Sequence, residues 1–295
     1  MMKRLGLILG ILTAIAFIPA AYYVKGILKG APISDAASST DGALPQQAGV
    51  DITYIANEGV LLSSGDKQVL VDGLHRNDRS FSHYAFLPPT QREKIETAQT
   101  PFEKIDLLLF SHRHYDHFHA EAAGLHLKHN PKTVLVSSQQ VTSEVAQNFK
   151  EYEAIRTRVL SATPPLKERV AMKVAGIEFE MLGLGHGSGR NSKIQNLGHV
   201  IKLGGRKLLH VGDVEFETGI FEKFNLDEEG IDIAILPYWL LVGKEGQTIV
   251  KDHIKPKHII AVHLETLNAE KITSQVKQFF PDAIAFTTML EKKRY

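Results

Sequence analysis

The segment SHRHYDH places three imidazoles and a carboxylate within seven residues. It directly follows an apolar run over 105–110, which predicts a buried strand that ends where the histidines begin. Side chains two positions apart on an extended chain point to the same side, so His112 and His114 can share one metal ion. Asp116 and His117 follow where the chain is expected to turn into a helix, with room for a second metal. Neutral imidazole and carboxylate are ligands that zinc, manganese and iron accept.

Three more side chains that can bind metal follow predicted strands further along the chain. His186 stands in GLGHGSGRN, Asp213 ends KLLHVGD, and His263 ends HIIAVH, each after an apolar run. Strand ends at one sheet edge converge on a crevice, which is where sites form in α/β folds. One such residue alone would indicate an ordinary turn or core position, and the first segment alone could be a histidine-rich helix start on the surface. Their order and contexts together predict a metal site.

The elements that must position these residues alternate between strands and helices. Strands are predicted at 51–56, 59–63, 68–72, 105–110, 133–137, 169–174, 177–182, 198–203, 206–211, 232–236 and 258–262. Helices are predicted at 90–98, 117–129, 139–150 and 268–279. Strand-rich halves with helices between and after them indicate an α/β fold, a sandwich of two sheets flanked by helices in the order αββα.

The first 49 residues have a different character from the rest of the chain. Lys3 and Arg4 precede a long apolar stretch, so residues 1–29 are predicted to be a signal peptide or an uncleaved membrane anchor. Residues 30–49 are rich in Ala, Ser, Gly, Pro and Gln and are predicted to form a flexible linker. The folded domain is therefore expected over 50–295, exported to the periplasm or to the extracytoplasmic face of the cytoplasmic membrane.

The composition limits the partners and the ligands. Lys and Arg number 34 against 33 Asp and Glu, and this near-neutral balance provides no field for capturing a nucleic acid. The chain has no cysteine, so disulfides and thiolate metal sites are excluded, and histidine and carboxylate are the strong ligands left. The expected partners are a small-molecule or lipid substrate and, through the N-terminal segment, a membrane.

From these residues the chain resembles the metallo-β-lactamase superfamily over nearly all of 50–295. TYIANEGVLLSSGDKQVLVDG looks like the family's first hairpins, and HRHYDH matches its H-x-H-x-D-H signature. The stretch NLGHVIKLGGRKLLHVGD resembles one branch of the superfamily most. That branch contains L-ascorbate-6-phosphate lactonase and the phospholipase D that hydrolyses N-acyl-phosphatidylethanolamine. The resemblance implies a metallo-β-lactamase fold with two mixed sheets. It also implies one metal held by His112, His114 and His186 and a second held by Asp116, His117 and His263, with Asp213 as a bridge.

A hydrolytic mechanism follows from such a pair of divalent ions, expected to be Zn²⁺ with Mn²⁺ or Fe²⁺ as alternatives. Two cations a few Å apart lower the pKa of a bridging water, and the resulting hydroxide would cleave an ester-like bond. Asp116 is expected to orient the hydroxide or accept its proton, which makes it the candidate catalytic residue. Asp72, Ser111 and His210 are expected to hydrogen-bond to the ligands.

Loops around the metals are expected to select the substrate. The stretch over 74–89 is too long for a plain turn, although its aromatic residues could equally seal the core. The candidate substrate contacts are His75, His83, Tyr84, Arg190, Tyr238 and Trp239. The bond cleaved is expected to be a phosphodiester, such as that of an N-acyl-phospholipid, or a lactone. A nuclease and a membrane-tethered binding or sensory domain without turnover are the alternatives.

Overall fold

The computed structural model describes residues 49–76 and 82–295, which belong to a unit that begins at Pro45. The predicted leader over 1–29 lies outside these residues, as does the predicted linker over 30–49 except for Gly49. In the described part of the chain, none of the helices has the length and apolar character needed to cross a membrane.

The first sheet begins with the two hairpins that the sequence predicts. Asn57 and Gly65 occupy the turns with φ of 53° and 57°, a left-handed conformation that asparagine and glycine tolerate best. Strand pairing is antiparallel through β3 and parallel from β3 to β6. The order is β14-β1-β2-β3-β4-β5-β6, with β1 at Asp51–Ala56, β2 at Gly59–Ser64, β3 at Lys67–Val71, β4 at Leu107–Leu109, β5 at Val134–Ser137, β6 at Val159–Ser161 and β14 at Lys292–Arg294.

The second sheet is also mixed. Its strands are antiparallel from β7 to β10 and parallel from β10 to β13. The order is β13-β12-β11-β10-β9-β8-β7, with β7 at Arg169–Val174, β8 at Ile177–Gly185, β9 at Gln195–Leu203, β10 at Arg206–His210, β11 at Ile233–Pro237, β12 at His258–Val262 and β13 at Ile284–Ala285.

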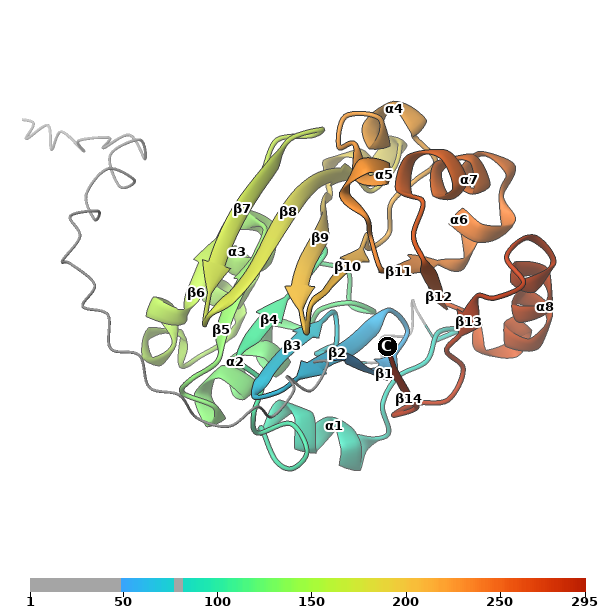
Figure 1. Cartoon of the computed structure of the whole chain (residues 1–295). Coiled ribbons are helices and arrows are strands. Elements are labelled where there is room, and N and C mark those ends of the chain that lie inside the picture. The colour runs from blue at the N-terminus through green and yellow to red at the C-terminus, as the bar shows by residue number, and fades with distance from the viewer. Residues whose placement is uncertain (1–48, 77–81) are drawn as a thin grey trace, which may run out of the picture. The chain divides into compact units, whose positions relative to one another are not determined.

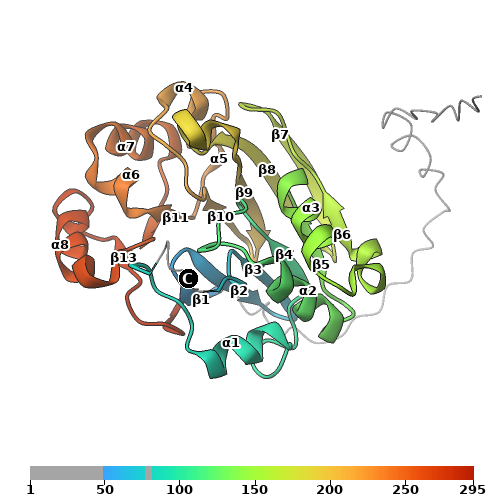
Figure 2. The ribbon, with the colours of Figure 1, turned by 180° about the vertical axis from the view of Figure 1, so that it is seen from behind.

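Helices cover the outer face of each sheet (Figures 1 and 2). The first three helices pack on the first sheet, and the later ones pack on the second. A π-helical turn at Ile249–Ile254 continues the second set. The helices are α1 at Pro89–Glu96, α2 at Ala120–His129, α3 at Gln139–Asn148, α4 at Thr218–Phe221, α5 at Leu226–Glu229, α6 at Tyr238–Val242, α7 at Lys244–Thr248 and α8 at Ala269–Phe279.

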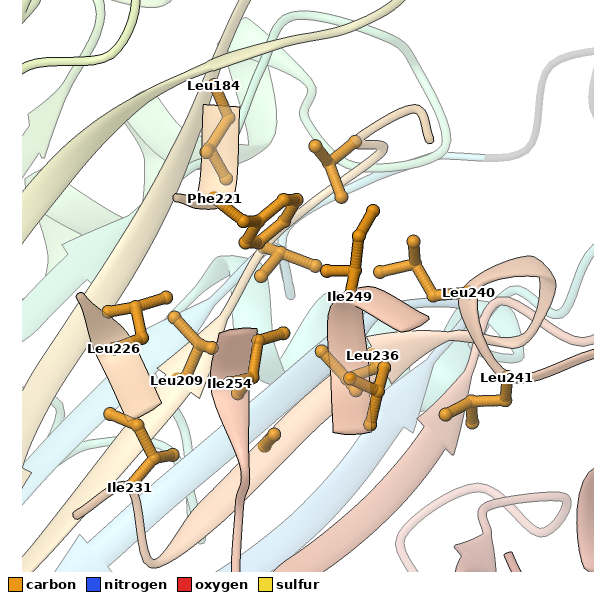
Figure 3. Packing of buried hydrophobic residues seen from close by; sticks show 14 of the residues in the cluster. Leu184, Leu209, Phe221, Leu226, Ile231, Leu236, Leu240, Leu241, Ile249 and Ile254 are labelled. Atoms are coloured by element: carbon orange, nitrogen blue, oxygen red, sulfur yellow. The ribbon is translucent and has the colours of Figure 1, made fainter. Parts of the chain in front are cut away.

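The alternation of side chains along each strand divides the core into three layers. In β3, Val69 and Val71 face the other sheet while Leu70 faces the helices, as the two-residue period of a strand requires. In β11, Ile235 lies between the sheets, and Leu236 belongs to the outer cluster that Figure 3 shows from close by. The predicted αββα sandwich of two mixed sheets is therefore confirmed.

The differences from the predicted elements are local. Strands β6, β13 and β14 and the helices between β10 and β12 were not predicted, because two to five residues are too few to show a period. The predicted helix over 117–129 was wrong at its start. Helix α2 begins at Ala120, because His119 remains extended and its Nδ1 accepts a hydrogen bond from the amide of Ala122 at 3.4 Å.

Candidate metal centre

The seven predicted ligands lie on four loops, each of which follows a strand. His186 follows the last residue of β8, and His263 follows the last residue of β12. Asp213 lies three residues after β10, and the remaining four ligands follow β4. Strand β4 belongs to the first sheet and the other three strands to the second. The site is therefore assembled where the ends of the two sheets meet.

The loop after β4 is a tight turn rather than a continuation of the strand. The predicted strand over 105–110 is shortened to β4, and the carbonyl of His114 accepts hydrogen bonds from the amides of His117 at 3.0 Å and Phe118 at 2.8 Å. The turn brings the side chains of His112 and Asp116 to the same region as those of His114 and His117.

The seven predicted ligands form two groups, which share one carboxylate. Within each group, the ligand atoms all lie within 4.8 Å of one another. The first group consists of His112, His114, His186 and Asp213, and the second consists of Asp116, His117, Asp213 and His263.

The carboxylate of Asp213 presents one oxygen to each group. Its Oδ1 lies 3.2 Å from the Nε2 atoms of both His117 and His263. Its Oδ2 lies 3.7 Å from the Nε2 of His112 and 3.5 Å from that of His186. Asp213 would therefore offer one oxygen to a metal ion held by either group.

The ring nitrogens in each group are spaced as metal ligands would be. The Nε2 atoms of His117 and His263 are 3.2 Å apart, and the Nε2 of His186 is 3.1 Å from the Nδ1 of His114. Two nitrogens bound tetrahedrally to one zinc ion at about 2.05 Å would be about 3.3 Å apart. The buried Nε2 of His112 has no hydrogen-bond partner among the described residues. The side chains therefore fit metal ions in both groups.

The three histidines of the first group are held in the neutral form. Burial lowers the pKa of His112 well below its usual value, and the neighbouring His117 lowers it further. Burial and the proximity of His186 lower the pKa of His114 to about 4. Burial also lowers the pKa of His186, although Asp213 opposes the shift. At neutral pH these imidazoles have lone pairs ready for a metal ion.

The histidines of the second group are held in the protonated form by the carboxylates around them. Burial alone would lower the pKa of His117, but Asp213 and Asp116 raise it well above the usual value. For His263 the same two carboxylates overcome burial and raise the pKa to about 10. Conversely, His117 and His263 overcome the effect of burial on Asp213 and hold its pKa well below the usual value. The second group therefore contains positive charge that a metal ion would replace.

Asp72 and Ser111 form the support behind the ligands, as predicted. One oxygen of Asp72 accepts hydrogen bonds from the Ser111 hydroxyl at 2.5 Å and from the Nδ1 of His117 at 2.9 Å. The Ser111 hydroxyl also lies 3.0 Å from the Nδ1 of His112. These contacts fix the rings so that the Nε2 atoms of both histidines point toward Asp213.

Asn57 holds the candidate catalytic carboxylate. Its Nδ2 donates to the Oδ2 of Asp116 at 3.2 Å and to the Asp116 carbonyl at 3.1 Å. The same Oδ2 lies 3.3 Å from the Nε2 of His263, whereas the buried Oδ1 has no hydrogen-bond partner among the described residues. One oxygen of Asp116 therefore faces the second group, and the other is left as an acceptor. From the sequence, Asn57 indicated only the turn of a hairpin.

Glu58 is a buried acidic residue beside the site that sequence reasoning missed. Its side chain is fully buried, with Oε2 3.8 Å from the Nδ1 of His117 and 3.7 Å from the Nε2 of His210. Burial and the charge of Asp213 raise the pKa of Glu58 to about 8. His210, which was predicted to support a ligand, instead has its Nε2 3.2 Å from the Glu58 carbonyl oxygen. From the sequence, Glu58 indicated only the turn between two predicted strands, and its burial is visible only in the structure.

Aromatic rings lie against the second group. The ring of Tyr84 meets that of His263 edge to face, with 4.1 Å between the ring centroids. The ring centroids of His83 and Tyr84 are 4.0 Å apart. The ring of Trp239 approaches His263 from α6 at 4.9 Å, and its Nε1 donates to the Val214 carbonyl at 2.9 Å. The predicted candidates Tyr84 and Trp239 are thus next to a ligand.

The other predicted substrate contacts lie further from the ligands or deeper in the fold. His75 is buried, with its Nε2 3.2 Å from the carbonyl oxygen of Ala56 and its ring edge to face with Phe86. Tyr238 is half-buried at the start of α6, where burial raises its pKa. Arg190 is exposed on the 3₁₀ turn Gly189–Lys193.

The sequence of this chain is similar to those of known metal-dependent hydrolases. The family model described as the beta-lactamase superfamily domain matches residues 69–273, which is more than half of the chain. A UPF0173 metal-dependent hydrolase of Natranaerobius thermophilus is 25% identical over 230 residues, which cover 73% of this chain and 83% of that protein.

Solved structures share the fold at low sequence identity. The metallo-beta-lactamase fold protein YhfI of Bacillus subtilis superimposes with a TM-score of 0.55 at 13% identity, covering 84% of this chain and 100% of the other. Igni18, a metallo hydrolase of Ignicoccus hospitalis, has a TM-score of 0.53 at 14% identity and covers 84% of this chain and 98% of its own. The expectation of a metal-dependent hydrolase of this superfamily is supported. The chain belongs to the beta-lactamase superfamily domain family.

Proposed function

We propose that the protein is a metal-dependent hydrolase with two divalent ions, one in each ligand group, that cleaves an ester-like bond. The observation that carries this proposal is the carboxylate of Asp213, which presents one oxygen to each group. When bound, two such ions lower the pKa of water, polarise the substrate oxygen and neutralise charge on the leaving group. The relatives named as metal-dependent hydrolases support the same class.

Asp116 is the residue that we assign to proton transfer. Asn57 holds its Oδ2 toward the second group, and its Oδ1 is left as an acceptor. Burial raises the pKa of Asp116, but His117 and the contact with His263 lower it below the usual value, so the side chain is ionised at neutral pH. An ionised carboxylate at this place can orient a water molecule and take up its proton.

The chemical type of the ligand side chains limits which metals the protein would bind. Imidazole and carboxylate without thiolate suit Zn²⁺, Mn²⁺ and Fe²⁺, and we propose Zn²⁺ as the first choice. The aromatic rings of Tyr84 and Trp239 beside His263 would contact an apolar part of the substrate. Both a phosphodiester and a lactone satisfy these features, and the two are separated by the test below.

The test compares metal content and turnover in matched variants. The full chain loaded with zinc is expected to hold about two equivalents by mass spectrometry and to hydrolyse bis-p-nitrophenyl phosphate or members of a lactone panel. Asp116→Asn should lose at least about 100-fold in kcat, the usual contribution of a positioned acid or base. Asp66→Asn removes a carboxylate that is 90% exposed and should change neither quantity.

Three results would overturn the proposal. A metal content that saturates at one equivalent would contradict the two-ion site. Equal inactivity of the parent and Asp116→Asn toward every substrate class would favour the binding or sensory alternative, and cleavage of nucleic acid alone would favour the nuclease.

The place of action is also a proposal, because the predicted leader lies outside the described residues. We propose that the domain acts beyond the cytoplasmic membrane, tethered or released according to whether residues 1–29 are kept. Fractionation of cells expressing the full chain, followed by N-terminal sequencing, distinguishes the two forms. Recovery in the cytoplasm with an intact N-terminus would contradict export.

A further inference from the structure

A cavity of about 360 Å³ opens beside the first ligand group. Its lining includes Gly185 and Gly187, the two neighbours of His186, and also Glu215, two residues after the bridging Asp213. The aromatic rings described above lie instead at His263, in the second group. The cavity is therefore lined by residues that flank His186 and follow Asp213 in the sequence, whereas the ligands themselves are not among its lining residues.

Leucine and isoleucine side chains form part of the cavity wall, together with polar side chains. Leu184 and Ile220 are buried, and Leu166 on the opposite side is 53% exposed. Gly185 lies between them and leaves space, since a Cβ there would be 3.6 Å from Ile220 Cδ1 and 3.9 Å from Leu166 Cδ1. A ligand that fills this space would remove the exposed surface of Leu166 from water, which favours an apolar ligand.

The charges at the cavity exclude an anion. No lysine, arginine or histidine is among the described residues that line it, while two glutamates are. Glu217 pairs with Lys167 at 3.4 Å, but Glu215 is exposed and its Oε1 accepts only a weak hydrogen bond from the amide of Ser188 at 3.3 Å. A phosphate or carboxylate entering here would meet a like charge.

The walls are also held in place by hydrogen bonds to α3. The side-chain oxygen of Gln140 accepts a hydrogen bond from the backbone amide of Gln195 at 3.0 Å. The side-chain oxygen of Gln195 accepts one from the backbone amide of Gln140 at 3.1 Å. The amide of Gln139 donates to the Thr163 hydroxyl at 2.8 Å, which anchors the wall that carries Leu166. A cavity formed before the ligand arrives costs less ordering on binding.

We infer that this cavity binds the alkyl chain of an acyl group, so that the substrate is an acyl ester or an alkyl-substituted lactone rather than a compound whose phosphate enters here. This inference rests on the proposed function. In the reaction, the oxygen of water forms a bond to the acyl carbon and the bond from that carbon to the alcohol oxygen breaks. The proton that Asp116 takes from water passes to the departing alkoxide oxygen. An ester then gives a carboxylic acid and an alcohol, and a lactone gives one hydroxy acid.

The experiment measures how hydrolysis by the zinc-loaded full chain depends on acyl length. The probes are p-nitrophenyl acetate, butyrate, octanoate and dodecanoate. We expect kcat/KM to rise at least about tenfold from butyrate to octanoate, because each buried methylene contributes about a fourfold factor. A flat dependence on chain length would overturn the inference.

Two leucine variants separate the cavity from general surface effects. Leu166→Asp places a charge at the cavity and should lower the ratio of kcat/KM for octanoate to that for acetate about tenfold. Leu267→Asp is the matched control, because Leu267 is 94% exposed and does not line the cavity. An equal fall in both variants, or no fall in Leu166→Asp, would contradict the assignment. Leu166→Ala, with its melting temperature, guards against a folding defect.

A binding measurement distinguishes failure of this inference from failure of the proposed function. If no ester is cleaved at any length, the hydrolase proposal fails for acyl substrates, and calorimetric titration with decanol tests the cavity alone. Binding to the parent that is lost in Leu166→Asp would support an alkyl site. Absence of decanol binding to the parent would overturn the inference whatever the activity.

Discussion

The Nδ1 of His117 lies 2.9 Å from the Oδ2 of Asp72, and this contact leaves the other ring nitrogen facing the carboxylate of Asp213. Both side chains are fully buried, so the orientation of the imidazole is fixed without competition from water. His117 belongs to the second ligand group, whereas Asp72 belongs to the end of the first sheet's hairpins. The fold of the N-terminal strands thereby controls the geometry of the second group.

Replacement of Asp72 by asparagine should weaken metal binding about 10–100-fold, the usual cost of losing a carboxylate that orients a ligand. Asp72 has a φ of 47°, a conformation that asparagine also adopts, so the backbone should be retained. Metal affinity by competition with a chelator checks this expectation, with Asp66→Asn as the control. Unchanged affinity in Asp72→Asn would show that the hydrogen bond to His117 does not matter for binding.

The two metal equivalents should differ in the protons that they release. The first group has neutral histidines, so its ion should displace almost none at pH 7. His117 and His263 have raised pKa values, about 10 for His263, so an ion in the second group should displace roughly two protons. Affinity for an ion in the second group should therefore rise with pH up to about 10, the pKa of His263. Zinc titration in weak buffer with a pH indicator measures both, and equal release by the two equivalents would contradict the assignment.

Glu58→Gln should make the metal-free protein more stable at high pH. The carboxyl of Glu58 has a pKa of about 8 in the folded state against 4.5 as its ordinary value. The folded form binds the proton of Glu58 more tightly than the unfolded form does. The stability that this protonation contributes is therefore complete below pH 4.5 and is lost as the pH rises through 8. Urea unfolding with chelator present should show the variant gaining on the order of 3 kcal/mol relative to the parent between pH 5 and pH 9. No pH-dependent difference would mean that Glu58 ionises freely.

The fluorescence of the protein should report on the second group alone. Trp239 is the only tryptophan of the chain, and its ring lies 4.9 Å from that of His263. Exchange of a proton for a metal ion on His263 changes the charge next to the indole, so emission should change with the second equivalent and not with the first. His263→Ala should abolish the change. We expect the first group to fill first, because its histidines are already neutral, and a response complete after one equivalent would contradict this order.

Much of the fold could be predicted because the strands that build it have a clear period. The three layers of the core follow from alternating side chains such as Val69, Leu70 and Val71. Helices α4 to α7 have only four or five residues each, so their apolar residues showed no helical repeat. Strand β14 depends on pairing with β1, more than two hundred residues away, which local sequence cannot indicate.

The ligand side chains could be anticipated because each one follows an apolar strand, as His186 and His263 do. The residues that support them were harder to predict. Asn57 and Glu58 occupy the turn of the first hairpin, where polar side chains are ordinary, and only tertiary packing buries them beside Asp116 and His117. The cavity beside Leu166 is formed by four separate segments, so no single stretch of sequence contains its signature.

The pairing of β14 with β1 joins the two ends of the described fold (Figure 1). Val50 and Tyr295 exchange two backbone hydrogen bonds of 3.0 Å, so these residues are neighbours in space. The described part of the fold therefore begins and ends at adjacent positions, so its order of connection can be changed without moving the metal ligands. A short linker from Tyr295 to Gly49, with new ends opened at the exposed turn between β9 and β10, would give a circular permutant with the same sheets.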